Sequence, residues 1–261
     1  MYEKPGVAPE IFPGGALPDI GATISETLNE FIENIGAYAF AGLSMMLVMI
    51  PAVLAMLFGV YMLLASVILG GAAGASGFMA ILPSDMAGIG GLLGVLLAIA
   101  IAVVGMTVVM GMFSAVIAPL NASLLRSIAA HQRGEGPLEF SAPFRAMGEN
   151  LGSVILGTTL LTLLGAGLAM MCYLPALLPM IFLSFAAPLI ALHNRSAMGG
   201  IGMAFRHAKN HLGWHLKYGF THLLVLMVSS QIPVVGYMFA IAFQVRMYRK
   251  VFGDGQEPVL V

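Results

Sequence analysis

Long uncharged apolar runs alternate along this chain with short segments that carry nearly all of its charge. The first run, residues 37–70, contains no charged side chain. As a helix it would reach roughly 50 Å, whereas the hydrocarbon core of a bilayer is about 30 Å thick. We therefore expect one tilted helix that projects beyond the bilayer and is kinked at Pro51, because proline removes a backbone hydrogen bond. The glycine-rich residues 70–90 predict a loop on the far side of the membrane.

Five further apolar runs predict five more spans. The fourth run of the chain is interrupted by Pro179 and Pro188, which allow a broken helix there. The expected fold is an all-α polytopic membrane protein with six transmembrane helices. The runs after the first are residues 91–119, 153–171, 176–192, 220–230 and 234–245.

Composition and charge placement support a membrane location and orient the chain. Hydrophobic residues make up 59% of the 261 residues and charged residues only 9%, against about 25% charged in a soluble domain. With six spans, all 11 Lys and Arg residues fall on the same side as both termini, and Asp85 alone among the 12 acidic residues does not. The positive-inside rule then predicts cytoplasmic termini in the inner membrane. A net charge of −1 gives no argument for nucleic acid, and the lone Cys172 excludes an intrachain disulfide.

Three polar segments, each preceding an apolar run, align without gaps over 13 residues. Their first, fifth and twelfth positions are apolar and their last is glycine. We expect three repeats of an interfacial amphipathic helix plus a transmembrane hairpin, with the glycine at the bend between them. The alternative is that any amphipathic helix entering a membrane has this pattern. The segments are ISETLNEFIENIG (24–36), FSAPFRAMGENLG (140–152) and IGMAFRHAKNHLG (201–213).

The domain organisation follows from this repeat. Residues 1–19 predict an irregular arm, residues 20–251 a single membrane domain, and residues 252–261 a flexible tail. The repeat units within the membrane domain are 20–125, 139–192 and 200–251.

Four sequence features together resemble a known family. They are the segment ISETLNEFIENIG before the first span, RGE at 133–135, the following segment with FR at 144–145, and YR at 248–249 closing the last span. The chain resembles bacterial uncharacterised six-helix integral membrane proteins, and it is similar to the membrane domains attached to some glycerophosphodiester phosphodiesterases. The resemblance implies an all-helical protein of the bacterial inner membrane. It brings no catalytic residues, because the catalytic domain of those enzymes is not in this sequence.

Histidines provide the main candidate for site chemistry. His207, His211, His215 and His222 share one face if the helix is continuous, and imidazoles four residues apart can share a metal or ligate haem. The repeat, however, places a bend at Gly213, which would separate the first two from the others. Histidines beside a tryptophan and lysines are also ordinary anchors at the headgroup boundary. The remaining candidate interfacial residues are Arg133, Arg145, Arg206, Lys209, Trp214, Lys217, Arg246 and Arg249.

The acidic face of the first polar segment suggests a charge pairing. Glu26, Glu30 and Glu33 line one side of the predicted interfacial helix, and the third segment is basic. If the repeats close into a bundle, we expect these carboxylates to pair with the cations of the third segment. Those cations are Arg206, Lys209 and Lys217.

Small residues mark a packing surface in the second span. Spaced three or four residues apart, they let helix backbones approach closely, whether within one chain or between chains. They are Gly94, Ala98, Ala102 and Gly105.

These features favour a non-enzymatic membrane scaffold or accessory subunit, without a cofactor, that self-associates or docks on a larger membrane complex. Amphipathic helices on one leaflet could also shape the bilayer. The alternative is a small-molecule or lipid transporter or channel, with proline-broken helices and His222 lining a path. The spans contain no Asp, Glu, Lys or Arg, which weighs against an active transporter. Membrane lipids are the expected partners, and nucleic acid is not.

Overall fold

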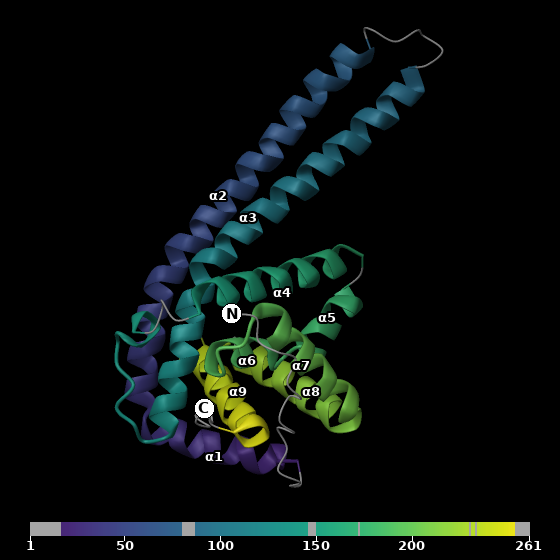
Figure 1. Cartoon of the computed structure of the whole chain (residues 1–261). Coiled ribbons are helices and arrows are strands. Elements are labelled where there is room, and N and C mark those ends of the chain that lie inside the picture. Colours follow the sequence, from purple (N-terminus) through teal and green to yellow (C-terminus); the bar gives the residue numbers. More distant parts are fainter. Residues whose placement is uncertain are drawn as a thin grey trace, which may run out of the picture. The chain divides into compact units, whose positions relative to one another are not determined.

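The computed structural model describes residues 17–79, 87–145, 150–171, 173–229, 231–232 and 234–253. Every regular element in these ranges is helical, which confirms the all-α class (Figure 1). Within the described ranges, two helical segments are long and apolar enough to cross a membrane, Ile35–Ala65 and Val103–Gln132. The elements are α1 (Ile20–Glu33), α2 (Ile35–Met79), α3 (Ala87–Gln132), η2 (Ala142–Phe144), α4 (Leu151–Met171), α5 (Tyr173–Phe182), α6 (Ala186–Leu192), α7 (Ala197–Asn210), α8 (Leu212–Ser229) and α9 (Val235–Phe252).

The chain divides into two compact units. Residues 48–117 form one, and residues up to 47 together with those from 118 onward form the other. The first unit is an antiparallel pair made from parts of α2 and α3, which run side by side in Figure 1. Glycines bring the two helices together: a Cβ on Gly59 would lie 3.5 Å from Val109 Cγ1, and one on Gly105 would collide with Leu63. The absence of side chains at these points allows the close approach.

The larger unit has an aromatic core centred on Phe185, which lies in the turn between α5 and α6. Its ring stacks on Tyr218 of α8 at 4.7 Å between centroids. Helix α8 packs closely on α5, because a Cβ at Gly219 would lie 2.5 Å from Ile181 Cγ2. The buried members of this core are Phe185, Ala186, Leu189, Ala204, Tyr218, Phe243, Met247, Tyr248, Val251 and Phe252.

Three helices begin at the same position of the 13-residue pattern. Helices α2, α4 and α8 start at Ile35, Leu151 and Leu212, the twelfth position each time. The residue before each start is Asn34, Asn150 or His211, and its carbonyl accepts from the backbone N–H four residues later, at 3.1, 3.0 and 2.9 Å. Asn150 has a φ of 50°, a left-handed conformation that asparagine tolerates better than most residues. The expected bend at the final glycine is therefore wrong, since the chain turns two residues earlier at a residue that caps the next helix.

The middle copy of the pattern also differs from the expectation. Its described part forms a short 3-10 turn, Ala142–Phe144, where an interfacial α-helix was expected. Pro143 has no N–H to donate, and Ser123 and Ser127 of α3 donate hydroxyl hydrogen bonds to the Ala142 carbonyl at 2.8 and 3.0 Å. Side-chain hydrogen bonds thus satisfy this carbonyl in place of a helical N–H.

Helix boundaries depart from the expected spans at three places. Helix α2 continues to Met79 and α3 begins at Ala87, so most of the expected loop at 70–90 is helical. Helix α3 passes through Pro119 to Gln132, well beyond the apolar run. The fourth run, by contrast, is split into α5 and α6 by a turn at residues 183–185. Glycine and proline are tolerated in helices of an apolar environment, where a loop would leave more backbone groups without partners.

Candidate functional site

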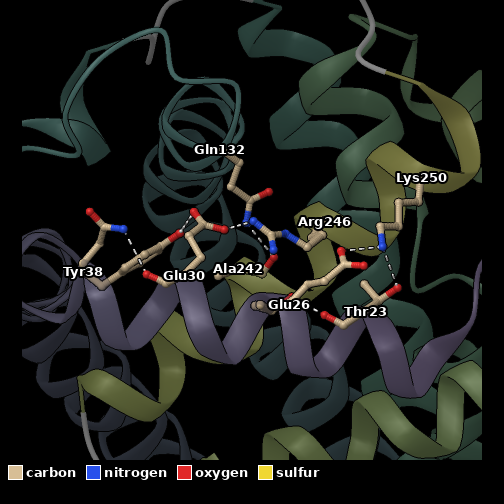
Figure 2. A network of polar contacts seen from close by, with 10 residues as sticks. Thr23, Glu26, Glu30, Tyr38, Gln132, Ala242, Arg246 and Lys250 are labelled. Carbon is tan, nitrogen blue, oxygen red and sulfur yellow. Dashed lines mark hydrogen bonds and ion pairs between the residues drawn. The ribbon is translucent and has the colours of Figure 1, made fainter.

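A polar network joins α1 to α9 and to the adjoining ends of α2 and α3 (Figure 2). The Glu30 carboxylate forms an ion pair with Arg246, and each of these side chains is only 18% exposed. The Tyr38 hydroxyl of α2 donates to Glu30 Oε1 at 3.0 Å. Gln132 at the end of α3 donates from Nε2 to the Ala242 carbonyl of α9 at 3.1 Å. The charged pair is therefore held among hydrogen bonds that involve two further helices.

A second, more exposed pair lies one helical turn away. Lys250 Nζ lies 2.5 Å from Glu26 Oε2, with side chains 35% and 49% exposed, and donates to Thr23 Oγ1 at 3.3 Å. Glu26 and Glu30 are four residues apart on α1, and Arg246 and Lys250 are four residues apart on α9. The pairs connect them in opposite order, as expected when two helices run antiparallel.

The expected pairing with the third segment is thus wrong, because Glu26 and Glu30 form ion pairs with cations of α9 instead. Glu26 and Glu30 contact α9, whereas Arg206 and Lys209 lie exposed on α7 and Lys217 is exposed on α8. Arg206 donates to the Gly202 carbonyl of its own helix at 3.4 Å. Glu33 is also exposed. Helix α1 buries Thr23, Thr27 and Phe31. Thr23 is the residue whose hydroxyl accepts a hydrogen bond from Lys250.

Histidines and aromatic rings form a second cluster, around Phe185. His207 is buried in α7, with its ring centroid 5.1 Å from that of His211, 5.4 Å from His215 and 5.1 Å from Phe252. Trp214 stacks on Tyr218 at 5.6 Å and donates from Nε1 to the Pro18 carbonyl at 3.0 Å. The cluster thereby connects α7 and α8 to the segment preceding α1.

Burial keeps the His207 imidazole neutral. Loss of hydration, followed by the positive potential of His215 and His211, lowers the pKa of His207 to about 3. The neighbouring His215 is fixed by its backbone contact: its Nε2 lies 2.9 Å from the Ile181 carbonyl, which requires that nitrogen to carry a proton.

The expected separation of the histidines at a bend is wrong. Helix α7 ends at Asn210 and α8 begins at Leu212, and the break brings His215 back against His207. Among the described residues, however, no group of three or more His, Cys, Asp or Glu side chains is arranged to hold a metal ion. The cluster is built by ring packing.

His222 lies in the same aromatic core. It is buried, its ring stacks on Tyr218 at 5.7 Å with planes 8° apart, and Phe243 flanks it at 6.3 Å. These contacts place His222 among the rings of the aromatic core.

An open surface cavity of about 180 Å³ lies beside the turn that follows α3. Arg133 and Glu135 close this turn with two hydrogen bonds of 2.6 and 2.7 Å, and Gly134 and Gly136 have positive φ angles of 77° and 152°. Arg145 lies 2.5 Å from Glu139. The lining combines two guanidiniums with one carboxylate and is formed by Arg126, Ser127, Ala130, His131, Glu135, Gly136, Pro137 and Arg145.

Exposed apolar side chains recur at equivalent positions of the 13-residue pattern. The fifth position is exposed in each copy, at Leu28, Phe144 and Phe205. The twelfth position, where the next helix begins, is also exposed, at Ile35, Leu151 and Leu212. All six lie in the same compact unit. Large apolar side chains directed outward at helix entries are typical of contact with a bilayer interface.

The structure describes only some of the remaining predicted site residues, which are the small residues of the second span and Arg249. Gly105 packs against Leu63 of α2, so its packing partner is a helix of the same chain. Gly94 is half-buried, and the side chains of Ala98 and Ala102 lie outside the described part of the structure. Arg249 is half-buried in the last turn of α9.

Comparisons with protein-family models, curated proteins and solved structures found no match.

Sequence reasoning missed the partners of the acidic face and the cavity. The signal for the first was present, because the spacing of four in Glu26 and Glu30 is repeated in Arg246 and Lys250. Tyr38 and Gln132 carried no such signal, since each lies near the end of an apolar helix and joins the network only through packing.

Proposed function

We propose that this protein is a non-enzymatic integral membrane scaffold or accessory subunit of the bacterial inner membrane. It self-associates or docks on a larger membrane complex. The observation that carries the proposal is a row of exposed apolar side chains on the unit formed by residues 48–117. On α3, side chains three or four residues apart are exposed, at Ile101, Val104, Val108 and Met112.

The second helix of this unit offers a similar surface. Exposed side chains on α2 follow the same helical spacing, at Ile50, Leu54, Leu57 and Tyr61. The two helices already pack on each other at Gly59 and Gly105, so these ridges are not needed to hold the pair together. In a bilayer such surfaces contact lipid or another protein, and helix association there depends on close side-chain packing.

The proposed topology has six crossings with cytoplasmic termini, arranged as three repeats. Its spans are α2, α3, α4, the broken pair α5–α6, α8 and α9. The common start of α2, α4 and α8 at the twelfth position supports the repeat. The outward apolar side chains at the fifth and twelfth positions support attachment of all three segments to one leaflet, where they could shape the bilayer. The proposed kinship with six-helix bacterial membrane proteins fits this arrangement.

The scaffold role is tested by counting copies in a membrane. The full chain, labelled on one cysteine, is placed in liposomes at falling protein-to-lipid ratios, and bleaching steps are counted. We expect more than one copy per particle to persist on dilution, and we expect Val104→Ala/Val108→Ala/Met112→Ala to shift particles to single copies. The matched control, Leu224→Ala/Met227→Ala, shortens exposed apolar side chains of α8 and should leave the count unchanged.

A single copy at all dilutions, with no protein partner retained on mild extraction from its native membrane, would refute the scaffold. Substrate flux abolished by His222→Ala would instead support the transporter alternative.

A further inference from the structure

Three exposed cations on α7 and α8 carry positive charge that no carboxylate of these helices balances. They are Arg206 and Lys209 on α7 and Lys217 on α8. The sequence has no Asp or Glu between positions 150 and 253, and among the described residues none of the three cations forms an ion pair. Cations elsewhere in the described chain do have carboxylate partners. Those that pair are Arg133, Arg145, Arg246 and Lys250.

The two cations of α7 share its outward face with apolar side chains. Met198 and Phe205 are exposed on this face, at helical spacing from Lys209, and the buried residues of α7 lie on the opposite face. Arg206 and Lys209 are three residues apart, and like charges at this spacing destabilise a helix unless a counter-charge is supplied. The α7 dipole favours a cation in the last turn, which accounts for Lys209 alone. The face therefore combines positive charge with apolar surface.

Helix α8 extends this surface as a row that begins at Lys217. Phe220, Leu224 and Val228 follow at intervals of three, four and four residues, and all of them are exposed. Such spacing places the four side chains on one face. From Lys217 to Val228 the helix rises about 17 Å, close to half of the roughly 30 Å hydrocarbon core of a bilayer. The apolar row thus matches one leaflet, with an ammonium group at its start.

The sign of the charge selects the lipid. A zwitterionic headgroup has no net charge, whereas an anionic one is attracted about fivefold by each Lys or Arg near the surface. We propose that the exposed face of α7 and the first half of α8 bind anionic phospholipids. The headgroups lie at Arg206, Lys209 and Lys217, and an acyl chain follows the apolar row of α8. The inference rests on the membrane embedding in the proposed function and not on the scaffold role.

The first interfacial helix provides a contrast within the same compact unit. On α1, Glu26 and Glu30 are paired with cations of α9, and Glu33 is exposed. Its exposed apolar side chains, Leu28 and Ile32, therefore lie beside negative charge. Anionic lipid is expected at α7 and α8 and not at α1.

The test uses the single tryptophan of the chain as a local reporter. Trp214 lies in the first turn of α8, between Lys209 and Lys217, and is half-buried. The full chain is placed in vesicles of phosphatidylcholine and phosphatidylglycerol, one of which is brominated in the upper part of its acyl chains, because bromine quenches tryptophan on contact. We expect a relative association constant about fivefold or more in favour of phosphatidylglycerol. In about 1 M salt, where the Debye length is about 3 Å, this preference should approach unity.

Variants assign the preference to the three cations. Lys217→Gln should reduce it about two- to fivefold, and Lys217→Arg should keep it, because both cations attract an anionic headgroup. Arg206→Gln/Lys209→Gln/Lys217→Gln should bring it close to unity. The control Arg145→Gln removes the same charge from an exposed side chain that Glu139 already pairs, and it should leave the preference unchanged.

The outcomes separate this inference from the proposed function. Equal quenching by the two lipids, a preference that survives in the triple variant, or the same loss in Arg145→Gln would each overturn it. Equal quenching would leave the cations to an acidic protein surface. If neither brominated lipid quenches Trp214, the membrane embedding fails as well, whereas copy number in liposomes tests the scaffold separately.

Discussion

His207 shows at the residue scale how packing overrides the usual behaviour of a side chain. An imidazole in water titrates near pH 6.5, but here the rings of Phe185, Trp214 and Phe252 surround it. His211 and His215 are the titratable neighbours, and a charge on either opposes protonation of His207. The ring therefore stays neutral in the folded protein at pH values where it would be charged in the unfolded chain.

This difference predicts an acid-sensitive stability. Since the folded pKa of about 3 lies below the unfolded value of 6.5, the unfolded chain binds the extra proton in between. The contribution of neutral His207 is fully present above pH 6.5 and is lost as the pH falls toward 3. Between pH 7 and pH 5 we expect a loss of about 1–2 kcal/mol, read as a lower thermal midpoint in detergent.

The variant His207→Gln should remove this share of the pH dependence, about 1–2 kcal/mol between pH 7 and pH 5, because an amide does not titrate. His211→Gln, which changes a half-buried neighbour, is the matched control and should retain most of it. An undiminished acid loss in His207→Gln would assign the effect to other groups.

Helices α1 and α9 show at the element scale how two weak sequence signals combine. Each helix has a pair of like charges four residues apart, which is unfavourable in an isolated helix. Antiparallel packing turns both pairs into two ion pairs, Glu26–Lys250 and Glu30–Arg246. Their environments differ, because the first pair is well exposed and the second is mostly enclosed.

Equivalent substitutions on α1 should therefore have unequal effects. Glu30→Gln leaves the enclosed Arg246 without its carboxylate, and we expect a loss of about 1–3 kcal/mol in the free energy of unfolding. Glu26→Gln should cost about 1 kcal/mol or less, because exposed pairs are weak. Thermal midpoints of the purified protein measure both.

A double-mutant cycle with Arg246→Gln isolates the enclosed pair. If Glu30→Gln destabilises the Arg246→Gln variant as much as it destabilises the unmodified chain, the two side chains are not coupled and the interpretation fails.

At the scale of the whole molecule, the placement of charge predicts which side of the membrane each segment faces. In a background with Cys172→Ser, single cysteines are introduced at 85, 133 and 206 and labelled with a membrane-impermeant reagent on intact cells. We expect position 85 to react from outside and positions 133 and 206 only after permeabilisation. Position 85 lies outside the described residues, and the expectation for it rests on the sequence.

Reaction of positions 85 and 133 from the same side would exclude the six-span topology. Position 206 is the internal control, because it should behave as position 133 does.

Composition and the apolar runs predicted the helical class and the positions of the apolar segments. An uncharged run such as residues 37–70 satisfies its backbone as a helix in an apolar environment, so this part of α2 followed from composition, whereas its extension to Met79 did not. The alignment of the three polar segments also indicated where new helices begin. It failed by two residues at each bend, because glycine permits a bend but Asn34, Asn150 and His211 supply the carbonyl that starts the next helix.

Which polar groups meet depends on how the helices pack. Glu30 could have paired with any of several cations, and the choice of Arg246 depends on α1 lying against α9. His207 and His215 come together because the chain breaks at His211, and the direction that the chain takes after the break depends on how α7 and α8 pack. The cavity joins Arg126 to Arg145 across a turn with two positive φ angles. Local pattern sets the hydrogen bonding and exposed faces of each helix, whereas contacts between distant residues depend on how all of those faces pack at once.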